Sequence, residues 1–208
     1  MTSNKKYKNL RKISIIASLI LVIISPILFY LKSPVWYYPG VLGVWLLFDN
    51  LSHLRKNKTT LDLILKGDYK KFVILYLTLL LFGFLIEGIG SLLLKFWSYP
   101  KLWSYEPLSK LIFINTIGYL FWPSILMSFR ETFNVLYSLL KNKVLSIVAS
   151  MIIGIFIWEI PNTFSKDWIY KFPYSNMEIF NINIIIVIAW TILIISPLYI
   201  YKILNIKS

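Results

Sequence analysis

The stretch KFVILYLTLLLFGFLIEGIGSLLLKFWSYP, residues 71–100, decides the fold. Between Lys71 and Lys95 it carries only one charged residue, Glu87. An apolar run of about 20 residues is long enough to cross a bilayer as a helix. The run ends in residues typical of a membrane interface, where indole and phenol rings keep their polar atoms wet and proline stops a helix: Trp97, Tyr99 and Pro100. The stretch therefore predicts a membrane span at 72–96.

Composition extends this prediction to the whole chain. The 208 residues are 58% hydrophobic and 15% charged, with a mean hydropathy of +0.69, whereas soluble domains carry about 25% charged residues. The sequence predicts an all-α integral membrane protein that forms a single polytopic domain over 1–208. We expect a six-span helix bundle with spans at about 13–32, 35–52, 72–96, 107–129, 143–163 and 179–201.

The same Trp-Tyr-Pro cluster recurs three times, in VWYYPG (35–40), in KFWSYP (95–100) and in DWIYKFP (167–173). Each cluster follows an apolar run, and Lys-rich segments separate the units. The pattern predicts three repeated helical hairpins whose aromatic turns share one side of the membrane. A plain aromatic belt is the alternative explanation of the clusters.

Charge predicts the orientation. Of the 22 Lys and Arg residues, 16 fall on the side opposite the aromatic turns. Under the positive-inside rule, that side is cytoplasmic, so both termini are expected in the cytoplasm and the chain in the cell membrane. This bias explains the net charge of +13 without a nucleic-acid partner. Membrane lipids are the expected partners, and the oligomeric state is left open. Segment 59–71 is expected to be either a short interfacial helix or a solvated loop.

The chain contains no Cys and one His, His53. No P-loop, dinucleotide-binding fingerprint, zinc motif or Ser-His-Asp set is present, so no cofactor and no metal site are predicted. Most of the nine acidic residues have simple explanations. Asp62, Asp68, Glu106, Asp167 and Glu178 are assigned to loops. Asp49 and Glu131 are placed near the cytoplasmic ends of spans, with Glu131 expected to form an interfacial ion pair with Arg130.

Glu87 and Glu159 have no such explanation. Each precedes a tryptophan of an aromatic turn by nine or ten residues, which at ~1.5 Å per helical residue places the carboxyl well inside the bilayer. An acidic side chain at that depth is costly, so we interpret both as catalytic or coupling residues that face the bundle interior as neutral acids. We expect one polar chamber around them in the outer half of the membrane. Its candidate substrate-binding residues are Trp97, Tyr99, Asn115, Trp158, Asn162, Trp168 and Tyr170. For the asparagines, hydrogen bonding between helices is the alternative.

The sequence WEIPNTFSKDWIY, residues 158–170, resembles the small membrane lycopene cyclase domains of carotenoid biosynthesis, in which a Trp-Asp-Asn element precedes a Trp-x-Tyr. The matching residues are Trp158, Glu159, Asn162, Trp168 and Tyr170, with Glu in place of Asp and the Asn displaced. The resemblance covers about sixty residues and implies redox-neutral, proton-initiated cyclisation of a polyene by a carboxylic acid. The family's paired Glu residues after a Pro are not reproduced, since WPSILMSFRETF (122–133) has Arg-Glu instead.

Three functions therefore stay open at the level of sequence. The first is acid catalysis on an isoprenoid or lipid, in which Glu87 or Glu159 protonates a double bond and aromatic rings stabilise the carbocation. The second is a proton- or cation-coupled transporter that uses the same carboxyl groups. The third is a non-catalytic assembly or scaffold subunit whose acids pair with a partner protein.

Overall fold

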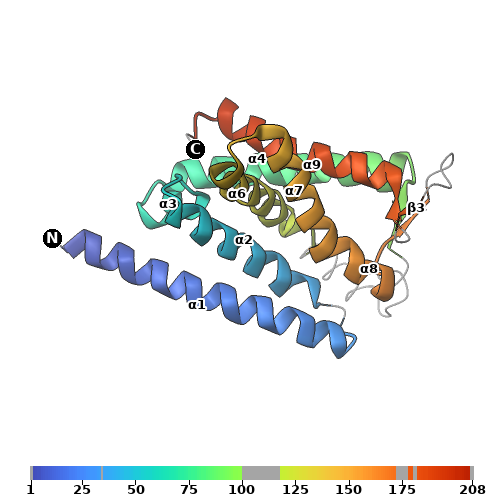
Figure 1. Cartoon of the computed structure of the whole chain (residues 1–208), viewed down its shortest axis with the longest axis horizontal. Coiled ribbons are helices and arrows are strands. Elements are labelled where there is room, and N and C mark those ends of the chain that lie inside the picture. The colour runs from blue at the N-terminus through green and yellow to red at the C-terminus, as the bar shows by residue number, and fades with distance from the viewer. Residues whose placement is uncertain (1, 34, 100–117, 172–177, 180–181, 207–208) are drawn as a thin grey trace.

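A computed structural model describes residues 2–33, 35–99, 118–171, 178–179 and 182–206. Within these residues the chain is mostly helical (Figure 1). The longer helices are α1 (Thr2–Tyr30), α2 (Tyr37–Leu54), α4 (Tyr69–Glu87), α6 (Trp122–Leu140), α7 (Lys143–Gly154) and α9 (Ile184–Ile203). The short segments are α3 (Thr60–Leu65), α8 (Ile160–Ser165), the π-helices η1 (Gly88–Leu93) and η2 (Ile155–Glu159), and the strands β1 (Trp97–Ser98), β2 (Ile169–Tyr170), β3 (Glu178–Ile179) and β4 (Ile182–Asn183).

In the described part of the chain, three continuous helices are long and apolar enough to cross a membrane: Lys5–Tyr30, Tyr69–Leu93 and Lys143–Ser165. They coincide with the spans predicted at 13–32, 72–96 and 143–163. Large apolar side chains on α1, such as Ile13, Ile16 and Ile23, are more than half exposed, as expected for a surface that faces lipid. The protein is thus a helical protein with three candidate membrane-spanning helices.

The central helix is α6, which packs against α2, α4, α7 and α9, while α1 lies along α2 at the edge of the molecule (Figure 1). Every residue from Pro123 to Val135 is buried. Part of the span predicted at 107–129 lies outside the described residues, and the helix α6 continues beyond residue 129 to Leu140. Pro123 lies in the first turn of α6, where a backbone N–H would have no acceptor within the helix. The absence of an N–H in proline therefore costs no helical hydrogen bond there.

A network that we call the inner charge cluster (Arg11, Asp49, Asp62, Arg130 and Glu131) joins α1, α2, α3 and α6. Arg11 donates to Asp49 at 2.6 Å and to Asp62 at 2.7 Å. Arg130 donates to Glu131, and its guanidinium lies 4.0 Å from the centre of the Tyr201 ring. All five residues are buried, so the cluster is part of the folded core.

The inner charge cluster is organised by the first turn of α3. The backbone N–H of Leu61 donates to Asp49 at 2.8 Å, and the backbone N–H of Thr60 donates to Glu131 at 3.2 Å. Thr59 and Asp62 also form a capping box at the start of this helix. Carboxylates from α2 and α6 thereby satisfy N–H groups that a helix leaves unpaired at its N-terminus.

These contacts correct two sequence predictions and add to a third. Segment 59–71 contains a helix, but Asp62 faces the core instead of belonging to a solvated loop. Arg130 and Glu131 do form an ion pair, yet the pair is in the middle of α6 with side-chain exposures of 2% and 0%. Asp49 is likewise fully buried. In each case a partner distant in sequence provides the compensating charge or donor.

Asp62 gives the cluster a measurable dependence on pH. Burial alone would raise the pKa of Asp62, but hydrogen bonds from the Tyr7 hydroxyl and the Arg11 guanidinium outweigh burial and lower it from 3.8 to about 2. A carboxyl with a depressed folded-state pKa stabilises the protein above its unfolded-state pKa, and this stabilisation is lost as the pH falls through the folded-state value.

We therefore expect Asp62→Asn to lower the thermal unfolding midpoint in detergent at neutral pH. The difference from the wild type should stay constant down to about pH 4 and narrow toward pH 2. Asp68→Asn is the matched control, because the Asp68 side chain is 54% exposed and should contribute little at any pH. A difference between wild type and Asp62→Asn that does not change with pH would contradict the ionised network.

Candidate functional site

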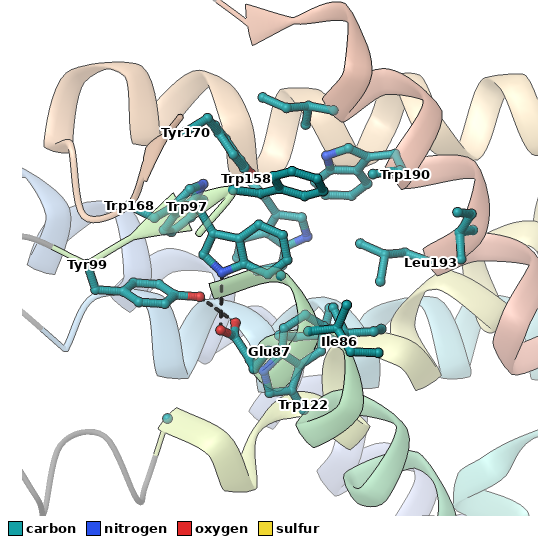
Figure 2. Close-up of a pocket in the computed structure, with 18 of the residues that line it drawn as sticks. Ile86, Glu87, Trp97, Tyr99, Trp122, Trp158, Trp168, Tyr170, Trp190 and Leu193 are labelled. Atoms are coloured by element: carbon teal, nitrogen blue, oxygen red, sulfur yellow. Dashed lines mark hydrogen bonds between the residues drawn. The ribbon is translucent and has the colours of Figure 1, made fainter. Parts of the chain in front are cut away.

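A cavity of about 610 Å³ lies among α2, α4, η1, η2, α9 and the aromatic turns. Glu87 and Glu159 both line it, together with ten or more aromatic side chains. The predicted site residues Trp97, Tyr99, Trp158, Trp168 and Tyr170 are also part of its lining. Figure 2 shows Trp97 and Tyr99 pointing at Glu87, with Trp158, Trp168 and Trp190 around the same space. The structure thus gathers Glu87 and Glu159, each on a candidate membrane-spanning helix, in one aromatic cavity.

Glu87 is the last residue of α4 and is 3% exposed. The indole Nε1 of Trp97 donates to its Oε2 at 3.1 Å. The hydroxyl of Tyr99 donates to its Oε1. Both carboxyl oxygens of a buried acid are therefore satisfied by residues of the aromatic turn that follows it.

Glu159 is the last residue of η2 and is also 3% exposed. Its Oε1 accepts from the hydroxyl of Tyr170 at 2.8 Å and from the indole of Trp190 at 3.0 Å. Its Oε2 accepts from the indole of Trp168 at 3.4 Å. The partners from the turn have the same residue types, in the same order, as those of Glu87.

Two short strands bring the two turns together. β1 and β2 pair antiparallel, with Trp97 opposite Tyr170 and Ser98 opposite Ile169. The backbone N–H of Lys171 donates to the carbonyl of Phe96 at 2.7 Å, which extends the contact. The strands thereby fix the relative positions of the donors that reach Glu87 and Glu159.

Both acids lie where the helix changes to π geometry. η1 follows Glu87 directly, and η2 ends at Glu159. π-helical segments are rare in proteins, and they occur often at functional sites. Pro161, in the first turn of α8, follows η2 and is incompatible with continued helical hydrogen bonding at its own nitrogen.

Two glycines make room for indole rings of the site, because glycine has no Cβ. A Cβ at Gly90 would lie 1.7 Å from the ring of Trp97, and one at Gly154 would lie 2.3 Å from the ring of Trp190. These two rings carry N–H donors to Glu87 and Glu159, respectively. The small residues are therefore required for the hydrogen bonds at the site, beyond allowing helices to pack closely.

The two asparagines predicted to bind substrate have different outcomes. Asn115 lies outside the described residues. Asn162 is not among the described lining residues, since its amide donates to the carbonyl of Trp168 at 2.9 Å and accepts from the N–H of Trp168 at 3.0 Å. Asn162 therefore positions Trp168 and does not touch Glu159 through a hydrogen bond. Its hydrogen-bonding capacity is used within the turn.

Two further contributors were not identified from the sequence. Trp190 donates to Glu159, and Tyr37 packs on Trp158 and Trp168 with ring centres 4.8 and 5.6 Å apart. Asp167, assigned to a loop, accepts from the indole of Trp36 at 2.6 Å and joins the first aromatic turn to the third. A tryptophan in the middle of the predicted span 179–201 was the available signal for Trp190, because belt tryptophans lie at the ends of spans.

The cavity wall also reaches the outer surface of the bundle. Ile89 of η1 and Ile192 of α9 line the cavity, although they are 49% and 58% exposed. Both helices are strongly apolar, so in a membrane these side chains face lipid. Apolar side chains that are exposed on the surface of the bundle thus form part of the cavity wall.

No known protein-family model matches the chain, and no curated protein or solved structure is significantly similar to it.

Because the ring of Trp97 lies directly against Gly90, substitution of this glycine tests the geometry at Glu87. We expect Gly90→Ala to displace Trp97 from Glu87 and to destabilise the protein by about 1–3 kcal/mol, the usual cost of overpacking. Gly88→Ala in the same π-helix is the matched control, because a Cβ there meets nothing within 4 Å. That variant should stabilise by about 0.5–1 kcal/mol through helix propensity.

Reversible unfolding in detergent, followed by far-UV circular dichroism, measures both free energies, and near-UV circular dichroism reports whether the indole has moved. Equal effects of Gly88→Ala and Gly90→Ala would contradict the seating of Trp97 on Gly90.

Proposed function

We propose that this protein takes a lipophilic molecule, an isoprenoid or another lipid, into the cavity between Glu87 and Glu159 and acts on it by acid catalysis. The observation that carries the proposal is the position of two buried carboxyl groups on the wall of one apolar, aromatic cavity. Two acids allow a balanced reaction. One carboxyl donates its proton to a carbon–carbon double bond, and the other, as a carboxylate, removes a proton from the resulting carbocation.

A route by which a lipophilic substrate could enter the cavity from the bilayer supports this proposal. A molecule dissolved in the bilayer can reach the cavity past Ile89 and Ile192, which are exposed on the lipid-facing surface and also line the cavity. Aromatic faces such as those of Trp97 and Trp158 would stabilise positive charge that develops on the substrate. The reaction would be a redox-neutral isomerisation or cyclisation, in agreement with the resemblance of residues 158–170 to small membrane lycopene cyclase domains.

The architecture that we propose for this function is a six-span bundle in the cell membrane, built from three repeated hairpins. The matching hydrogen bonds of Glu87 and Glu159, and the pairing of β1 with β2, support a repeat of the second and third hairpins. Substrate and membrane lipids would be its partners.

A proton-coupled transporter is the second candidate. Its specific support is the interruption of both acid-bearing helices by π-helical segments, because discontinuous helices surround the binding sites of many transporters. The scaffold alternative has less support. Glu87 and Glu159 accept hydrogen bonds within the chain, so neither needs a partner protein to be satisfied.

The exchange of Glu159 for glutamine tests the acid role. Glutamine preserves the volume of the side chain but has no acidic proton, so Glu159→Gln and Glu87→Gln should each reduce product formation by a factor of 100 or more, on the order expected for loss of a general acid or base. Lipid extracts of cells that express the wild type or a variant are compared by chromatography and mass spectrometry, with the signature being a product of unchanged mass and altered retention. Glu178→Gln, in the short strand β3, controls for loss of a carboxylate as such.

Protein abundance in the membrane must stay normal for this test. A silent Glu159→Gln variant, with product levels equal to the wild type, would refute acid catalysis.

The proposed orientation has its own test. Because the chain has no cysteine, Lys58→Cys and Lys166→Cys each introduce one thiol at an exposed position. A membrane-impermeant maleimide should label Lys166→Cys in intact cells, and Lys58→Cys only after lysis, because the Lys-rich side is proposed to be cytoplasmic. Labelling in the opposite order would reverse the orientation.

A further inference from the structure

Two buried carboxyl groups of the cavity, those of Glu87 and Glu159, have no basic residue beside them to neutralise them. Among the described residues that line it, none is Lys, Arg or His. The inner charge cluster is different, because each of its carboxylates is in contact with an arginine. The carboxyl groups of the cavity must therefore either hold protons or receive a positive charge from a ligand.

The hydrogen bonds around these acids suit the ionised form. Three of the five donors are indole N–H groups, which can donate but never accept: those of Trp97, Trp168 and Trp190. Each oxygen of Glu87 and Glu159 accepts at least one bond, and Oε1 of Glu159 accepts two. A carboxylate is a better acceptor than a neutral acid, so the site stabilises negative charge once a proton has left.

The same bonds restrict the kind of cation that fits. Since all four carboxyl oxygens already have donors, a ligand with several N–H groups of its own would compete with the tryptophans and tyrosines. A cation without N–H groups needs no such bond and can lie against ring faces. Several rings are available on the cavity wall, among them those of Trp158, Trp168 and Tyr37, and cation–π attraction is strongest where water is excluded.

We propose that the cavity binds a lipophilic organic cation that lacks N–H groups, such as a quaternary ammonium or phosphonium ion, in exchange for a proton of Glu87 or Glu159. The inference rests on the proposed function, because a carbocation formed by proton transfer to a double bond has the same charge and the same need for aromatic faces. The exchange is balanced: one cation enters, one O–H bond of a carboxylic acid breaks, and one proton leaves to the solvent. In an enzyme the bound cation blocks the substrate, and in an antiporter it is the cargo.

Other titratable groups also face the acids and must be considered. Tyr37 of α2 interacts electrostatically with both carboxyl groups, and Tyr119 interacts with Glu87. Tyr99 and Tyr170 are in direct contact with the acids, and Tyr38 and Asp167 also line the cavity. The tyrosines ionise only at alkaline pH in ordinary surroundings, so the proton that is exchanged is assigned to a carboxyl group.

Two ions of nearly equal size and opposite charge test the inference. Purified full-length protein in detergent is titrated calorimetrically with tetraphenylphosphonium and with tetraphenylborate. We expect the phosphonium to bind and the borate not to bind. Repetition in buffers of different ionisation enthalpy should show release of about one proton, and affinity should rise up to about tenfold per pH unit where the acid is protonated. Equal binding of the two ions, or phosphonium binding without proton release, would overturn the proposal.

Variants then assign the binding to the cavity. Glu87→Gln and Glu159→Gln should each weaken phosphonium binding about tenfold or more, on the scale of the loss of one charge pair. Asp68→Asn, whose side chain is largely exposed, should bind as the wild type does. Unchanged binding in both glutamine variants would overturn the assignment, and if a variant does not fold, proton release by the wild type still decides the proposal.

The outcomes separate this inference from the proposed function. Loss of lipid product in Glu159→Gln without phosphonium binding refutes the cation site and leaves acid catalysis standing. Phosphonium binding with proton release, together with unchanged lipid extracts in Glu159→Gln, refutes acid catalysis and leaves the cation site.

Discussion

A carboxyl group inside an apolar helix bundle must find hydrogen-bond donors there, and this constraint organises the protein. The inner charge cluster meets it with two arginines and with the backbone N–H groups of α3. Glu87 and Glu159 meet it with the polar atoms of tryptophan and tyrosine. Each solution ties together helices that are distant in sequence, so that satisfying the acids also assembles the bundle.

The hydrogen bonds from tryptophan and tyrosine to Glu87 and Glu159 depend on backbone features as much as on side chains. Trp97 can reach Glu87 only because Gly90 has no Cβ, and Trp190 reaches Glu159 over Gly154. The π-helical segments begin or end at the acids themselves. Pairing of β1 with β2 then locks the turns that carry the remaining donors. Displacement of Trp97 would leave the buried Oε2 of Glu87 without the donor that it has in this structure.

Glu87 and Glu159 could be identified from the sequence because their signal is local. Glu87 and Glu159 stand out as charges within apolar runs, and their donors Trp97 and Trp168 follow at nearly constant spacing. The three long apolar helices were predictable for the same reason, because length and hydropathy are properties of a continuous segment. Arg11 and Asp62 are 51 residues apart, and no periodicity relates them, so their pairing could not be predicted. The course of α6 was equally hidden, since a buried Arg-Glu pair looks in sequence like the end of a span.

Carboxyl groups paired with arginine and carboxyl groups bound by neutral rings differ in their ability to take up a proton. A carboxylate paired with a buried arginine cannot take up a proton without leaving the arginine charge uncompensated, which is costly in an apolar interior. Asp49 and Glu131 are held by arginines and by backbone N–H groups of α3, and these contacts serve the fold. Indole and phenol donors are neutral, so Glu87 and Glu159 can gain a proton and become neutral without stranding a charge on a neighbour. In the proposed function, loss of a proton from either acid would make the cavity negative and favour a cation or a developing carbocation. The choice of neutral donors, in place of basic ones, thus distinguishes Glu87 and Glu159 from the carboxylates of the inner charge cluster, whose arginines join the helices.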